Sequence, residues 1–177
     1  MKKTLLSTLL VAASLAALAP AAQATDGTIN FTGSVLASTC TVSTGTNGNF
    51  SVVLPPVSTK TLATAGNTAG RTPFSIQLTG CGATPVKAQT FFEAGPTVNQ
   101  STGRLTVTGG ATNVEIGLLN ATFQDIKAGA PLASQNTDVV AITGGTATMN
   151  FYAQYVATGA AGAGTANSSL QYTISYQ

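Results

Sequence analysis

Apolar and polar residues alternate in many short stretches from residue 27 to the end of the chain, as they do in half-buried β-strands. In residues 27–35 the apolar side chains of Ile29, Phe31 and Val35 share one face and polar side chains take the other. Glycine, proline, asparagine or serine bounds each stretch, which is typical of strands between turns. The other clear segments are residues 74–78, 147–155 and 170–177, and shorter candidates are residues 50–54, 86–92, 105–108, 114–119 and 139–142.

No long window has the spacing of an amphipathic helix, so the chain is predicted to be all-β. Many short strands with one buried face favour an antiparallel sandwich. Residues 59–71 form a long connection, in which we expect a short helical turn. The glycine-rich residues 158–164 are predicted to be a hairpin loop between the last two clear strands.

The N-terminus has the layout of a secretory signal peptide. Two lysines precede an apolar run from Leu5 to Leu18, and a small-residue sequence ending at Ala24 follows. The run is shorter than the roughly 20 residues that a membrane-spanning helix needs. We predict that residues 1–24 are removed, which leaves 153 of the 177 residues and one domain. A retained N-terminal anchor is the alternative.

The charge balance changes when the signal peptide is removed. The whole chain has seven Lys and Arg against five Asp and Glu, and loss of the two N-terminal lysines leaves five of each, a formal net charge of zero. No cluster of basic residues remains that could follow a phosphate backbone, so we predict no nucleic-acid partner.

Side chains for catalysis are scarce. Histidine is absent from the sequence, which removes the commonest general base and the commonest metal ligand. Folding could bring Glu115 and Asp125 together, but their spacing does not indicate a glycosidase-like pair, and we expect solvated charges. We therefore predict no catalytic residues, no metal and no cofactor. A secreted β-sandwich enzyme is an alternative that these residues do not support.

The two cysteines, Cys40 and Cys81, are predicted to form a disulfide, because an exported small domain folds in an oxidising compartment. Closing a loop of this length contributes about 4 kcal/mol in the chain-entropy model. A metal-binding or redox pair is the alternative, but it would lack both a short spacing and a histidine partner.

Two features are unusual for a self-contained sandwich: the first strand candidate begins near the predicted cleavage point, and the last one runs to the final residue. One sheet edge would then have no chain left to cover it. Five motifs, in this order, resemble the pilins of the chaperone–usher pathway and the type 1 fimbrial major subunits in particular. These motifs are residues 27–35 (GTINFTGSV), 40–42 (CTV), 74–81 (FSIQLTGC), 151–159 (FYAQYVATG) and 172–177 (YTISYQ).

The resemblance implies an incomplete immunoglobulin-like β-sandwich of six strands that lacks the seventh. Residues 25–36 would be an N-terminal donor-strand extension and residues 37–177 the pilin domain, with Cys40 and Cys81 joining the first two strands. The donor residues would be Gly27, Ile29, Phe31, Gly33 and Val35. The acceptor groove would contain Val42, Leu170, Tyr172, Ile174 and Tyr176.

The same resemblance implies a structural subunit of a bacterial fimbria that polymerises by donor-strand exchange and supports cell adhesion. Its partners would be further copies of itself, a periplasmic chaperone, an outer-membrane usher, minor pilins and a tip adhesin. The chain would be exported through the periplasm to the cell surface. A minor or adaptor pilin and a carbohydrate-binding adhesin are the alternatives. For Tyr176, which matches the penultimate tyrosine of the family, the alternative is an ordinary core aromatic.

Overall fold

The computed structural model describes residues 27–32 and 40–177. The chain divides into two units, residues 1–35 and 36–177. In the first unit, residues 27–32 are in neither a helix nor a strand, and the side chains of Ile29 and Phe31 are 79% and 91% exposed. Gly33 and Val35, the other apolar positions of the predicted donor segment, lie outside the described residues.

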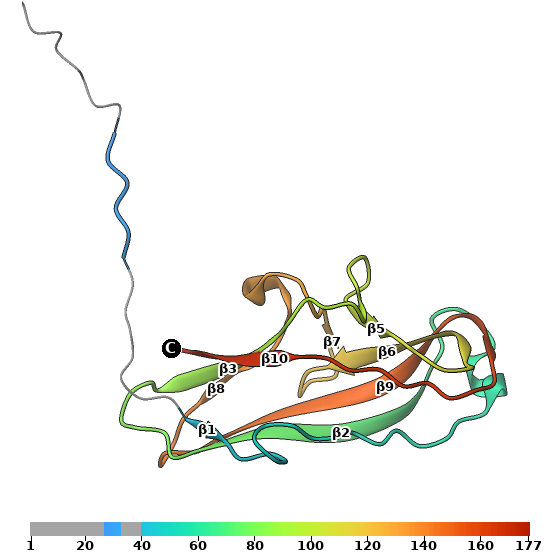
Figure 1. The fold of residues 1–177 in the computed structure, drawn as a ribbon, viewed down its shortest axis with the longest axis horizontal. Helices are drawn as coiled ribbons and strands as arrows, with labels where there is room; N and C mark the ends of the chain where they lie inside the picture. The colour runs from blue at the N-terminus through green and yellow to red at the C-terminus, as the bar shows by residue number, and fades with distance from the viewer. Residues whose placement is uncertain (1–26, 33–39) are drawn as a thin grey trace, which may run out of the picture. The chain divides into compact units, whose positions relative to one another are not determined.

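The second unit consists of two antiparallel sheets (Figure 1). The larger sheet has the order β1-β2-β9-β6-β5-β4, and β7 also pairs with β6. The smaller sheet has the order β10-β3-β8. The larger sheet is formed by β1 (Thr41–Val42), β2 (Thr68–Thr79), β4 (Val98–Asn99), β5 (Arg104–Thr106), β6 (Thr112–Leu119), β7 (Asp125–Ile126) and β9 (Ala147–Gly162). The smaller sheet is formed by β3 (Lys87–Phe92), β8 (Val139–Ala141) and β10 (Tyr172–Tyr176).

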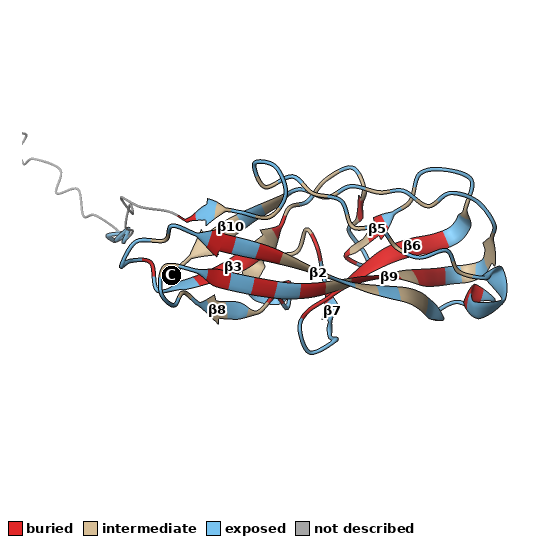
Figure 2. Cartoon of the chain, turned by 90° about the horizontal axis from the view of Figure 1, so that it is seen from below, coloured by how far each residue is buried: buried red, intermediate tan, exposed pale blue. Residues whose placement is uncertain are grey.

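The core lies between the two sheets because their strands alternate buried and exposed side chains. Along β9, Met149 and Phe151 are buried while Thr148 and Asn150 are exposed (Figure 2). Aromatic rings connect the layers: Phe151 lies 5.3 Å from Phe92 of β3, between ring centroids. Burying large apolar side chains of this kind contributes about 1.5–3 kcal/mol each.

A disulfide joins Cys40 to Cys81, with their Cα atoms 4.2 Å apart. Cys40 immediately precedes β1 and Cys81 follows β2 by one residue, so the bond connects the ends of the first two strands. The prediction of this disulfide is confirmed.

The sandwich expected from the alternating pattern is confirmed, although the described residues contain ten strands, several of only two or three residues. The helical turn expected in residues 59–71 is the 3-10 helix η1 (Thr59–Leu62), and a second, η2 (Leu132–Ser134), follows later. Neither helix of the described chain has the length or the apolar character needed to cross a membrane.

The hairpin predicted at residues 158–164 is wrong. β9 continues to Gly162, which pairs with Thr112 of β6, and the next strand, β10, belongs to the other sheet. This end of β9 continues as a strand because its small residues let its backbone lie close to β6. A Cβ on Gly162 would overlap Oγ1 of Thr112.

Candidate functional site

A groove of about 660 Å³ opens into the side of the sandwich. One wall is the segment 48–54, before β2, and the other is the segment 166–172, which leads into β10. The floor consists of core side chains from β2, β3, β5, β6 and β9. They are Phe74, Ile76, Phe92, Leu105, Ile116, Leu118, Ala153 and Tyr155.

The first wall has the side-chain pattern of a strand without the pairing of one. Phe50, Val52 and Leu54 are half-buried and pack against the core, while Ser51 and Val53 are exposed. Residues 50–54 form no backbone hydrogen bond with the rest of the described chain. The segment ends at two consecutive prolines, residues 55 and 56, which have no backbone N–H to donate.

The second wall leads into β10, which is bonded to β3 along one edge only. The N–H of Glu93 donates to the C=O of Gln171 at 2.9 Å, and Gln177 exchanges two backbone bonds of 3.0 Å with Lys87. Alternate residues of an antiparallel strand direct their backbone groups to the same side, so the odd-numbered residues of β10 face β3. The residues with N–H and C=O groups that face away from β3 are Tyr172, Ile174 and Tyr176.

No strand of the described chain pairs with that outer edge of β10. Two backbones with free hydrogen-bonding groups therefore border an apolar floor. Exposed backbone donors and acceptors of this kind are a template for another strand.

Hydrogen bonds to β5 and its flanks hold the second wall in place before β10 begins. Thr108 and Asn167 exchange backbone bonds of 2.7 and 3.0 Å. The hydroxyl of Ser168 donates to the C=O of Thr106 at 2.8 Å. The second wall is consequently fixed to the larger sheet.

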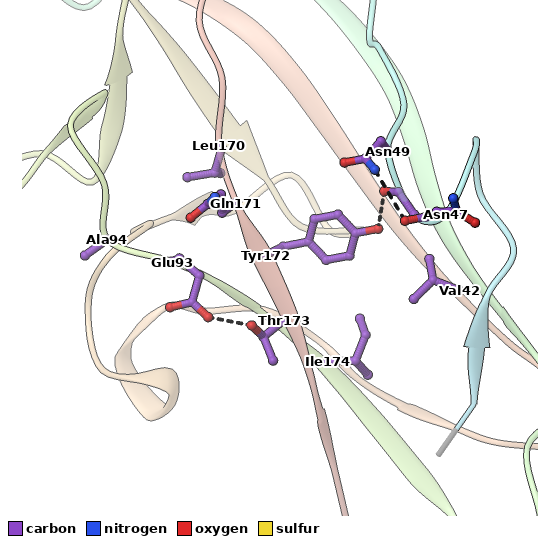
Figure 3. Close-up of a pocket in the computed structure, with 11 residues that line it drawn as sticks. Val42, Asn47, Asn49, Glu93, Ala94, Leu170, Gln171, Tyr172, Thr173 and Ile174 are labelled. Atoms are coloured by element: carbon purple, nitrogen blue, oxygen red, sulfur yellow. Dashed lines mark hydrogen bonds between the residues drawn. The ribbon is translucent and has the colours of Figure 1, made fainter. Parts of the chain in front are cut away.

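Of the five predicted groove residues, Leu170 and Tyr172 line the 660 Å³ groove. Val42 and Ile174 line an adjoining hollow of about 590 Å³, which Leu170 and Tyr172 also border (Figure 3). Tyr176 lines neither hollow; its half-buried ring packs against the core, and its hydroxyl donates to the C=O of Cys40 at 3.4 Å.

The sequence did not predict that most of the floor residues belong to the groove, nor that Phe50, Val52 and Leu54 form one of its walls. Alternation in residues 50–54 marked that wall as a strand candidate. No local signal assigns it to the groove, because the floor is assembled from five strands that are distant in sequence.

The carboxylates of Glu115 and Asp125 both approach Arg104, at 4.0 and 3.9 Å. Glu115 is buried and also accepts a bond of 2.6 Å from the side chain of Asn99. Folding thus brings these two acids to one cation, in a structural ion-pair cluster away from the groove.

Burial raises the pKa of Tyr172 and of Tyr176 above the ordinary value for a tyrosine. Both groups therefore bind their proton more tightly in the folded state, and the stability they contribute is complete below pH about 10. It is lost as the pH rises through the raised values. We expect the free energy of unfolding, measured with urea, to fall above a pH of about 10. In the variant Tyr172→Phe/Tyr176→Phe this fall should be smaller. An equal fall with pH in the two proteins would contradict the prediction.

Comparison with known proteins agrees with this architecture. The family model described as "FimA: Type-1 fimbrial protein, A" matches residues 54–177. The major fimbrial subunit SMF-1 of Stenotrophomonas maltophilia (strain K279a) is 50% identical over 169 residues, covering 92% of this chain and 99% of the relative. The F17 fimbrial protein of Escherichia coli is 43% identical over 169 residues, covering 92% and 93%. The P pilus rod subunit PapA, at 21% identity, has a similar fold with a TM-score of 0.58 over 78% of this chain and 99% of the other.

The two sheets form an immunoglobulin-like sandwich, the fold of the P pilus rod subunit PapA. The chain belongs to the type-1 fimbrial protein family. It is a structural subunit of a surface fimbria, in which it assembles with other subunits. The family consists of structural proteins.

Proposed function

We propose that the subunits polymerise by donor-strand exchange, in which residues 25–36 of one copy occupy the groove of another. The observation that carries the proposal is that the backbone of residues 50–54 and the outer edge of β10 are both unpaired beside a groove with an apolar floor. A strand lying between them would bond to both walls and bury its apolar face on the floor. This is β-strand addition, the mode of recognition in which an extended segment completes an exposed sheet edge, as in the donor-strand complementation of pilins.

The N-terminal segment has the chemistry that such a groove requires. Ile29 and Phe31 are two residues apart, so in an extended strand they point to the same side, and both are largely exposed in the free chain. Burying them contributes about 1.5–3 kcal/mol each. Thr28 and Asn30 would form the opposite, solvent-facing side.

Gly27, Gly33 and Val35 belong to the same face of the proposed donor strand. The glycine at position 27, on this face, would let the donor backbone lie close to the groove. In this proposal residues 1–24 are a removed signal peptide, and residues 37–177 are the acceptor domain. Leu170 and Tyr172 line the groove, and Val42 and Ile174 line the adjoining hollow. Tyr176 would contribute its backbone groups on the outer edge of β10.

A subunit with an empty groove leaves Phe50, Val52 and Leu54 only half-buried beside two free backbone edges, which favours aggregation. We therefore propose that a periplasmic chaperone covers the groove during export and that an outer-membrane usher is the place of exchange. Minor pilins and a tip adhesin would use the same joint, and the finished fibre would support cell adhesion.

Amide hydrogen exchange tests the joint at β10. The amides of Tyr172, Ile174 and Tyr176 point away from β3, along the edge where the donor strand would pair. They should exchange fast in the free subunit and at least about 100-fold more slowly in fibres, equivalent to ~2.8 kcal/mol. The amides of Thr173 and Ser175, on the side of β3, are the matched control within the same strand. They should be protected in both states.

Comparable exchange of the three amides on the outer edge of β10 before and after polymerisation would contradict the proposal. Slower exchange of all five amides by one common factor would indicate general stabilisation of the domain, and it would also contradict a strand added at this edge.

A further inference from the structure

Tyr172 spans the groove from one wall to the other. Its hydroxyl donates to the C=O of Gly48 at 2.7 Å (Figure 3), although the two residues are 124 positions apart in the sequence. The ring also meets Phe50 edge-on, at 6.2 Å between centroids. The two walls are therefore joined directly at this point.

The tyrosine stands where the two hollows meet. The 660 Å³ groove and the 590 Å³ hollow share four residues: Gly48, Asn49, Leu170 and Tyr172. The first is floored by the apolar core. The second continues toward Val42 and Ile174, with Glu93 and Thr173 at its edge.

A tight turn presents the acceptor carbonyl. Thr46 and Asn49 exchange backbone bonds of 3.0 Å, and the residues between them, Asn47 and Gly48, have φ values of +52° and +79°. Glycine suits this left-handed conformation, and a Cβ on Gly48 would lie 3.2 Å from the hydroxyl of Tyr172. Both partners of the bond are thus positioned by the fold.

We propose that the hydrogen bond between Tyr172 and Gly48 is a clasp that closes the empty groove and that an incoming strand has to open. The inference rests on the proposed donor-strand function. A strand bonded to both walls and running past Tyr172 crosses the line between the hydroxyl and the carbonyl. It also supplies backbone N–H groups that compete for the same acceptor.

The variant Tyr172→Phe keeps the ring and removes only the hydroxyl. We expect it to take up a strand faster than the wild type, by about 3–10-fold, the factor that corresponds to one net hydrogen bond. The probe is a fluorescent peptide of residues 25–36, in large excess over full-length chain freshly refolded at low concentration. Fluorescence anisotropy follows the uptake.

Tyr152→Phe is the matched control. Tyr152 lies on β9 but lines neither hollow, and its ring packs against Phe123, 4.7 Å away between centroids. Loss of its hydroxyl should leave the uptake rate unchanged. Equal acceleration in both variants would overturn the clasp, because the effect would then follow from the loss of any tyrosine hydroxyl of the domain.

The remaining outcomes separate the clasp from the function on which it rests. If wild type and Tyr172→Phe take up the peptide at one rate, the clasp is refuted and donor-strand exchange stands. If neither protein binds the peptide, both ideas fail. Should Tyr172→Phe not fold, the wild-type hydroxyl proton of Tyr172 can be followed by NMR: slow exchange in the empty groove and fast exchange with peptide support the clasp, and no change overturns it.

Discussion

Replacing Ile29 and Phe31 together with serine should abolish fibre formation while leaving the acceptor domain folded. Both side chains are exposed in the free chain, so the substitution removes nothing from the core of the same molecule. It removes about 3–6 kcal/mol of burial from the proposed joint, more than about 100-fold in affinity. Electron microscopy and the ladder of denaturant-resistant oligomers measure the result.

The opposite face of the same segment supplies the control. Thr28→Ser/Asn30→Ser introduces the same residue at two neighbouring positions that would face solvent, and fibres should form normally. Normal fibres from the Ile29 and Phe31 variant would show that these side chains do not enter a partner. Loss of fibres in both variants would show that extended-strand alternation does not govern the joint.

Removing the disulfide should have the largest effect on the stability of the domain itself. Cys40→Ser/Cys81→Ser frees a loop with a sequence separation of 41, and we expect a loss of about 4 kcal/mol. The corresponding fall in the melting temperature is roughly 10–20 °C. Urea unfolding and calorimetry of the unpolymerised chain give both quantities.

Chemical reduction provides the matched comparison for this variant. The wild-type chain in excess reductant should unfold at the same urea concentration as the double-serine chain, because both lack the same covalent constraint. A double-serine chain as stable as the oxidised wild type would show that the bond contributes little beyond the packing around Cys40.

Alternation along the chain predicted where strands lie better than how they pair. Residues 74–78 and 147–155 are within β2 and β9 as expected, since these segments pair with each other and bury one face each. Residues 50–54 show the same alternation without a partner. A pattern of side chains reports which face is buried, and it contains no information on whether the backbone has a neighbour.

The candidate site was predicted in part for the same reason. Leu170 and Tyr172 were found because they lie on one continuous alternating segment with a family motif. The floor of the groove was not predicted, since Phe74, Leu105 and Ile116 come from three different strands. Only the order of strands in the sheet brings these residues together, and that order depends on long-range packing.

Pro55 and Pro56 end the first groove wall. A proline has no backbone N–H to give to a neighbouring strand, although its C=O can still accept. In the proposed joint, the first wall would therefore lose its backbone donors at two consecutive positions after Leu54, and pairing on that side would weaken there whatever the length of the arriving segment.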